Sequence, residues 1–162
     1  MGSNRSKLKK YNVVDLFCGV GGLTLGFDQT KRFSTIFAND VDNDMCQAYK
    51  LNFPEALISD DSIADIDFKE ISNKKKIDIV IGGPPCQAYS TSGKRLLTDP
   101  RAVLFREYFR AIKDLKPSLF IYENVKGLLS IGQGQLINEI KELFFSQGYN
   151  LRLEVLDRKS VV

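Results

Sequence analysis

The segment IGGPPCQAYSTSGKR, residues 81–95, contains the side chain of this sequence best suited to covalent chemistry. Cys86 follows Gly82, Gly83 and two prolines. Proline fixes one backbone dihedral and glycine permits close packing, so the thiol would sit on a stiff turn at the edge of a cleft. A thiolate is a strong nucleophile when its pKa is lowered or its substrate is activated. The segment therefore predicts a nucleophilic cysteine.

The rest of the composition limits how this cysteine could work. The 162 residues include no histidine, which excludes Ser-His-Asp and Cys-His catalysis within the chain. The three cysteines are widely spaced and form no CxxC pair, so we expect no disulfide framework and no metal site. This cysteine usage favours a reducing compartment such as the cytoplasm. We interpret Cys18 and Cys46 as core-packing residues.

Charge and hydropathy place the chain among ordinary globular domains. Hydrophobic residues make up 43% and charged residues 27%. A net charge of +3 is too small to indicate nucleic-acid binding by itself. No apolar run approaches the roughly 18 residues that span a membrane, so we expect no membrane partner. Residues 1–10 are interpreted as a basic N-terminal tail.

Strand-like apolar runs alternate with amphipathic runs of helical length. Such alternation predicts a mostly parallel sheet with helices on both faces. The run at 77–83 is continuously apolar, as in a strand that is covered on both faces. The predicted strands are 11–17, 33–40, 55–59, 77–83, 117–124 and 149–157, and the predicted helices are 23–31, 42–52, 101–115 and 135–147.

Reactive residues follow nearly every predicted strand. In open α/β sheets, ligands bind outside the carboxyl ends of the strands, and this convergence predicts one site at that edge. The residues concerned are the glycine turn at 18–22, Asp40, Asp60, Asp61, Pro84, Pro85, Cys86, Glu123 and Asn124.

Two features at this edge favour a nucleoside-bearing cofactor. The turn CGVGG lets the backbone approach a ligand at a helix start, although it is not a GxGxxG motif and a purely structural turn would also explain it. Asp40 ends the second strand, where such folds hydrogen-bond ribose hydroxyls; a solvated acidic loop is the alternative. Glu123 could protonate or hydrogen-bond a substrate, for which partial burial would suit it, or could serve as a structural ion-pair partner.

The chain resembles the C5-cytosine DNA methyltransferases. The resemblance is carried by DLFCGVGGLTLGF, NDVDNDMCQAYKLNF, IDIVIGGPPCQAYSTSGK, DPRAVLFREYFRAIKDLKPSLFIYENVKGLL and LEVLD, in this order. The pairing of Pro-Cys-Gln with Glu-Asn-Val at this spacing is highly specific. The resemblance implies a Rossmann-like, class I S-adenosyl-L-methionine-dependent methyltransferase fold that is incomplete at its C-terminal end. Residues 11–162 would form a partial catalytic domain.

The resemblance also implies roles for individual residues. Cys86 would add to C6 of a cytosine flipped out of double-stranded DNA, and Glu123 would hold N3 and the exocyclic amine. Asp40 would bind the ribose of the cofactor, and Asp60 or Asp61 would accept from its adenine amino group. The remaining cofactor residues would be Phe17, Gly19, Gly22, Val41, Pro85 and Leu104, and the nucleic-acid contacts would be Gln87, Ser90, Gly93 and Lys94.

The family pattern continues beyond the segments found here. The matching part lacks an arginine segment that contacts the flipped base, a target-recognition domain and a returning C-terminal helix. We therefore expect one part of a split or truncated enzyme, with no activity from the chain alone. In the split case, a complementing polypeptide would carry the missing parts. A restriction–modification role in the cytoplasm of a bacterial or phage-infected cell fits this interpretation. The alternatives are an RNA cytosine methyltransferase and a noncatalytic cofactor- or partner-binding domain on the same fold.

Overall fold

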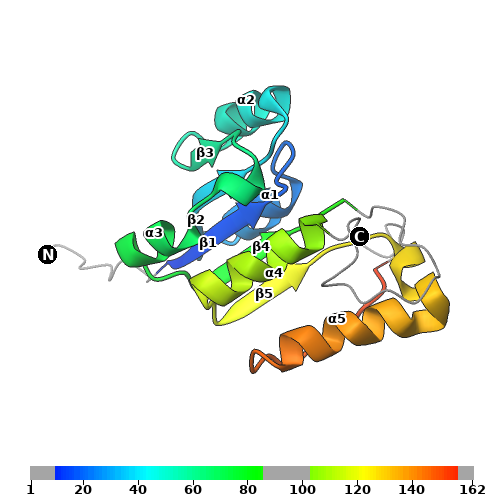
Figure 1. Cartoon of the computed structure of the whole chain (residues 1–162). Coiled ribbons are helices and arrows are strands. Elements are labelled where there is room, and N and C mark those ends of the chain that lie inside the picture. The colour runs from blue at the N-terminus through cyan, green and yellow to red at the C-terminus, as the bar shows by residue number, and fades with distance from the viewer. Residues whose placement is uncertain (1–9, 86–102, 157–162) are drawn as a thin grey trace, which may run out of the picture.

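A single parallel sheet organises the protein. The computed structural model describes residues 10–85 and 103–156. Within these residues, five strands lie in the order β3-β2-β1-β4-β5, and every neighbouring pair is parallel (Figure 1). The strands are β1 (Tyr11–Leu16), β2 (Phe33–Asn39), β3 (Leu57–Ser59), β4 (Ile79–Gly82) and β5 (Leu119–Tyr122).

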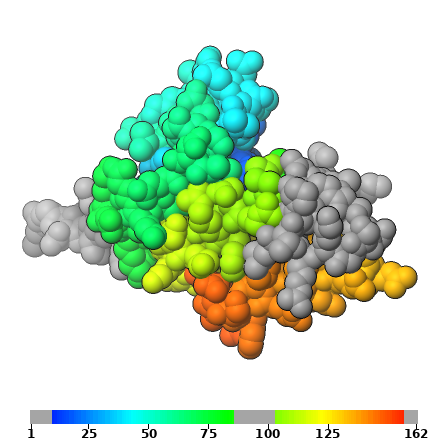
Figure 2. All heavy atoms as spheres, in the orientation of Figure 1, coloured from blue at the N-terminus to red at the C-terminus, as the bar shows by residue number. Residues whose placement is uncertain are grey.

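Helices cover both faces of this sheet, as the strand–helix alternation predicted. On one face, Val13, Ile79 and Ile81 pack against α1, while Ala38 packs against α2. On the other face, Val14 and Val80 join a larger core with α3, α4 and α5, whose atoms lie side by side in Figure 2. Alternate residues of β1 thus enter different cores, as the period of a strand requires. The helices are α1 (Gly22–Gln29), α2 (Asn43–Asn52), α3 (Phe68–Lys74), α4 (Val103–Leu115) and α5 (Gln135–Phe145), and the 3-10 turns are η1 (Ile63–Asp65), η3 (Lys126–Leu129) and η4 (Ile131–Gly134).

The segment between β3 and β4 contains structure that the sequence analysis did not predict. Asp67 caps α3 by accepting from the backbone N–H groups of Lys69 and Glu70. Arg110 on α4 donates to the carbonyls of Ile66 at 3.0 Å and Ile63 at 2.7 Å. A seven-residue helix is too short for a clear hydrophobic period, so its position depends on its cap and on the long-range contacts of the turn that precedes it.

The predicted sixth strand is wrong for the residues that the structure describes. Residues 149–156 contain no strand, although Leu151, Leu153 and Val155 alternate with polar residues as a strand would. A strand is stable only when its N–H and C=O groups are paired. Among the described residues no strand lies beside this segment, and the three apolar side chains are 38% to 55% exposed.

One face of β5 is also exposed. In the ladder between β4 and β5, Ile79 lies opposite Leu119 and Ile81 lies opposite Ile121. Both β4 residues are buried beneath α1, whereas Leu119 is 51% and Ile121 37% exposed. One face of the sheet is therefore covered over β4 and uncovered over β5.

No helix within residues 10–85 and 103–156 has the length and apolar character needed to cross a membrane.

Candidate active site

The carboxyl edge of the sheet gathers the chemistry-bearing residues that the structure describes. Because all five strands are parallel, the segments that follow them leave the sheet at one edge. Those segments are the turn at 17–22 after β1, Asp40 after β2, Asp60 and Asp61 after β3, Gly83 to Pro85 after β4, and Glu123 and Asn124 after β5.

The glycine turn has one face packed and one face open. Gly19 and Gly21 have φ values of +51° and +95°, which favour glycine. A Cβ on Gly21 would lie 2.2 Å from the Phe53 ring, whereas a Cβ on Gly19 or Gly22 would meet no atom within 4 Å. Phe17 also has a positive φ, of 56°. The turn thus presents its backbone to open space at the start of α1, as a ligand-binding turn must.

Asp40 is joined directly to this turn. Its Oδ2 accepts from the backbone N–H of Gly19 at 2.8 Å, and its Oδ1 accepts from that of Asp42 at 3.0 Å. Each carboxylate oxygen has a second lone pair, so both can accept further hydrogen bonds. Val41, beside it, is 75% exposed. The structure therefore brings a carboxylate acceptor and an exposed apolar side chain to the open face of the turn.

The two aspartates after β3 have different partners. Asp60 Oδ2 accepts from the amide of Asn43 at 2.9 Å, which ties it to the start of α2. Asp61 Oδ2 accepts from the hydroxyl of Ser59 at 2.8 Å. Both side chains are exposed at the same edge. The choice between them as the adenine contact stays open.

The segment that leads to Cys86 lies against the end of β5. The carboxylate Oε2 of Glu123 lies 2.6 Å from the position of a Cβ on Gly83, so only a glycine leaves room for it there. Asn124 donates its side-chain amide to the carbonyl of Pro84 at 2.9 Å. Glu123 and Asn124 are thus brought together with the turn that precedes the predicted nucleophile.

The remaining predicted site residues fall into two groups. Five lie outside the described residues: Cys86, Gln87, Ser90, Gly93 and Lys94. Of the others, Pro85 is exposed and Leu104 is half-buried on α4, packed against the main core. Glu123 is exposed, so the partial burial expected of it is not seen in the described part of the chain. Cys18 and Cys46 are 7% and 6% exposed, which confirms their interpretation as core residues.

A buried carboxyl group, that of Asp15, lies behind the glycine turn and was not predicted from the sequence. Asp15 is 1% exposed and accepts from the hydroxyl of Thr24 at 2.7 Å. Burial raises the pKa of this carboxyl to about 7, the Thr24 hydrogen bond opposes that shift and the charge of Asp40 adds to it. Its Oδ1 has no hydrogen-bond partner in the described structure. A signal was present in the sequence, since an aspartate stands inside the apolar run YNVVDLF.

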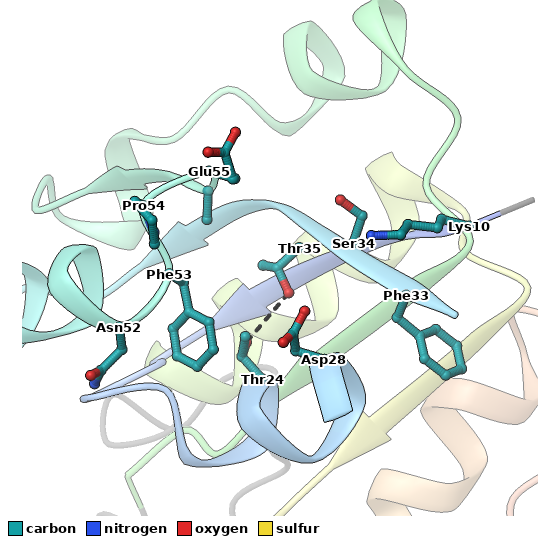
Figure 3. A pocket seen from close by; sticks show the side chains of 11 residues that line it. Lys10, Thr24, Asp28, Phe33, Ser34, Thr35, Asn52, Phe53, Pro54 and Glu55 are labelled. Atoms are coloured by element: carbon teal, nitrogen blue, oxygen red, sulfur yellow. Dashed lines mark hydrogen bonds between the residues drawn. The ribbon is translucent and has the colours of Figure 1, made fainter. Parts of the chain in front are cut away.

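A cavity of about 270 Å³ lies elsewhere, between α1, the first half of β2 and the end of α2 (Figure 3). Thr24, Thr35 and Asn52 line it from these three elements, and Phe53 lines it directly after α2. None of the predicted site residues borders it, and it lies near the amino ends of the strands. The cavity is therefore distinct from the candidate active site.

Known methyltransferases are similar to this chain in sequence. A family described as C-5 cytosine-specific DNA methylase matches residues 11–161. The chain belongs to this family. Type II methyltransferase M.XorII of Xanthomonas oryzae pv. oryzae is 43% identical over 143 residues, covering 85% of this chain and 34% of that protein. Type II methyltransferase M.AgeI of Thalassovita gelatinovora is 40% identical over 149 residues, covering 89% and 34%.

Solved structures show the same fold. A chain described as a DNA modification methyltransferase encoded within an E. coli prophage matches with a TM-score of 0.70 and 31% identity, over 85% of this chain and 38% of that one. DNMT2 of Spodoptera frugiperda matches with a TM-score of 0.61 and 26% identity, over 83% and 41%. The Rossmann-like methyltransferase fold is thus confirmed. The chain spans about a third to two fifths of the length of these relatives.

Proposed function

We propose that this chain is the cofactor- and nucleophile-bearing part of an enzyme that methylates C5 of cytosine in DNA. The observation that carries the proposal is the contact of Glu123 and Asn124 with the Gly83–Pro84 segment, immediately before Cys86. Family membership supports the same assignment. Because the relatives are Type II methyltransferases of bacteria, we place the enzyme in a restriction–modification setting in the cytoplasm of a bacterial or phage-infected cell.

The open face of the glycine turn fits S-adenosyl-L-methionine. Gly19 and Gly22 leave room for a ligand, and Asp40 offers carboxylate oxygens for hydroxyl donors. Phe17 and Val41 would supply apolar contact, Asp60 or Asp61 would accept from the adenine amine, and Pro85 and Leu104 would line the same pocket. The cofactor, when bound, supplies an electrophilic methyl group.

The residues of the chain would activate the cytosine. The Cys86 thiolate would add to C6, forming a C–S bond and moving electron density to C5 and N3. Glu123 would hold a proton at N3 and accept from the exocyclic amine, which stabilises that density. After C5 gains its methyl group it loses its proton, the C–S bond breaks and the thiolate is released. Since the substrate is activated in this way, the cysteine needs no histidine.

Double-stranded DNA would be the substrate, with the target base flipped out of the stack. Gln87, Ser90, Gly93 and Lys94 would contact the flipped nucleotide and its phosphates. The relatives are two to three times longer than the matched region, so we propose that a complementing polypeptide supplies the arginine segment, the target-recognition domain and the C-terminal helix. The exposed face of β5 and the lack of a strand in residues 149–156 of the described structure support this proposal.

Covalent trapping tests the proposal. The chain would be incubated with S-adenosyl-L-methionine and duplex DNA that contains 5-fluorocytosine, alone and with the C-terminal two thirds of M.XorII as a separate chain. Fluorine at C5 blocks the final elimination, so a working Cys86 stays attached to the DNA. We expect an adduct only in the mixture, and none with Cys86→Ser.

Each other result has a definite meaning. An adduct from the chain alone would contradict the need for a complementing polypeptide. No adduct in the mixture, together with binding of S-adenosylhomocysteine, would favour the noncatalytic cofactor-binding domain. An adduct on fluorocytosine-containing RNA in place of DNA would favour the RNA methyltransferase.

A further inference from the structure

Three buried polar groups behind the glycine turn form one directional chain. The hydroxyl of Thr24 lies 2.7 Å from Asp15 Oδ2 and 2.9 Å from the hydroxyl of Tyr49. Thr24 donates its single hydroxyl proton to Oδ2 of Asp15, so Thr24 can only accept from Tyr49. Burial raises the pKa of Tyr49, which keeps the phenol protonated and able to donate. Tyr49 thus donates to Thr24, and Thr24 donates to Asp15.

This series of hydrogen bonds joins the three elements that enclose the turn. Asp15 lies near the end of β1, Thr24 in the first turn of α1 and Tyr49 on α2. All three are at most 2% exposed, so bulk solvent competes little for their hydrogen bonds. Figure 3 shows Thr24 reaching from α1 toward Thr35 on β2, with the ring of Phe53 on its α2 side. The hydroxyl of Thr35 is the weaker neighbour, at 3.4 Å.

The ring of the same tyrosine packs against the backbone of the turn at Gly21. A Cβ on Gly21 would lie 3.1 Å from the ring of Tyr49 and 2.2 Å from that of Phe53. The two rings pack together with centroids 4.9 Å apart. Because the hydroxyl of Tyr49 is held by Thr24, its ring cannot move away from Gly21 without breaking that hydrogen bond. The position of the turn is thus coupled to the hydroxyl chain.

We propose that Tyr49 and Thr24 are positioning residues of the cofactor site. They act through Gly21, and they hold the turn at 18–22 so that the open faces of Gly19 and Gly22 line the pocket. The inference rests on the proposed function, because it assigns the turn to the cofactor. It goes beyond that function by naming two residues that touch no ligand and yet set cofactor affinity.

Hydrogen exchange and cofactor binding test this role together. Amide exchange would be followed at residues 18–22 and, as an internal reference, in β4 and β5. Binding of S-adenosylhomocysteine to the whole chain would be measured by calorimetry. The variants are Tyr49→Phe and Thr24→Val, each of which removes one hydroxyl, and Thr24→Ser, which keeps it. Thr35→Val is the matched control within the network, and Tyr11→Phe is the matched control on an exposed tyrosine.

We expect Tyr49→Phe and Thr24→Val to speed exchange at residues 18–22 about five-fold, the factor that one net hydrogen bond contributes, without changing β4 and β5. Binding of S-adenosylhomocysteine should weaken by a similar factor. Thr24→Ser should restore both values, and the two controls should stay close to the wild type.

Three results would overturn the proposal. They are equal acceleration in β4 and β5, no change at residues 18–22, and failure of Thr24→Ser to restore the wild-type values. If no protein binds S-adenosylhomocysteine, the cofactor assignment fails, and the exchange data still decide whether the two hydroxyls position the turn.

Discussion

The two halves of the sheet differ in how many of their polar groups have hydrogen-bond partners and how much of their apolar surface is covered. Between residues 11 and 61, the glycine turn is held from behind by Tyr49 and from the side by Asp40. Asn39 donates to the carbonyls of Ser59 at 3.0 Å and Asp61 at 2.9 Å, which ties β3 to the same edge. At the other end of the sheet, β5 has a half-exposed face, and residues 149–156 form no ladder.

This difference separates two kinds of site. The proposed cofactor side is built from contacts within about fifty residues of one another, so we expect the chain to organise it without help. The proposed nucleophile side has its local hydrogen bonds, such as Asn124 to Pro84, but its outer apolar surface has no cover among the described residues. We infer that cofactor binding survives in the chain alone and that base chemistry requires further polypeptide.

The largest effect is expected where the cofactor side is most tightly packed. Gly21→Ala would place a Cβ against Phe53 at a residue with φ of +95°. Left-handed strain and overpacking together should lower the free energy of unfolding by about 5 kcal/mol. Gly26→Ala, in α1 and with no atom within 4 Å of its Cβ, should instead raise it by about 1 kcal/mol. Urea denaturation of both variants checks the contrast, which equal effects would contradict.

A second test uses the pH dependence of the buried carboxyl. Because the pKa of Asp15 is raised to about 7 in the folded state, its protonated form stabilises the fold fully below pH 3.8, and this contribution is lost as pH rises through 7. Asp15→Asn cannot ionise. Relative to the wild type, the variant should therefore gain about 4 kcal/mol between pH 4 and pH 8.

Unfolding free energies of both proteins at several pH values would show this gain. Other groups titrate in both proteins and cancel in the difference, although Asp40 is a charged neighbour that contributes to the shift. A difference that does not change with pH would mean that folding leaves the pKa of Asp15 unchanged.

The sequence predicted the sheet well because the signals for its strands are local. Continuous apolar runs such as 77–83 predicted buried parallel strands, and parallel strands bring their carboxyl ends to one edge. The turn, Asp40 and Glu123 could thus be assigned to one site because each directly follows a predicted parallel strand. The roles of individual residues there came from the family resemblance, and they remain predictions.

What could not be predicted depends on partners far away in sequence. The turn that leads into α3 is held by Arg110, more than forty residues later in the sequence. The segment 149–156 has the pattern of a strand, but no strand pairs with it among the described residues. The link from Tyr49 through Thr24 to Asp15 crosses three elements, so no short motif contains it. A buried aspartate in an apolar run was the available clue, but its partners are defined only by packing.

A smaller effect is expected at the contact between β5 and the segment before Cys86. Asn124→Ala removes the donor to the Pro84 carbonyl and the acceptor of the Val125 N–H group. The free energy of unfolding should fall by about 1 kcal/mol, and adduct formation in the two-chain trapping assay should slow. Asn150→Ala, at an exposed position, is the matched control. Normal trapping by Asn124→Ala would show that this hydrogen bond does not position the nucleophile.

The smallest effect on the isolated chain is expected at the uncovered face of β5. Ile121→Lys and Leu119→Lys alter side chains that are already 37% and 51% exposed, so each should change the free energy of unfolding by less than about 0.5 kcal/mol. In the mixture with the C-terminal part of M.XorII, the same variants should abolish the trapped adduct, because a buried lysine without a partner is strongly unfavourable. Leu57→Lys, at the opposite edge and 64% exposed, should leave the adduct unchanged. If the β5 variants trap DNA as well as the wild type does, this face is not where the complementing polypeptide binds, and the contrast between the two halves must arise from residues 149–156 instead.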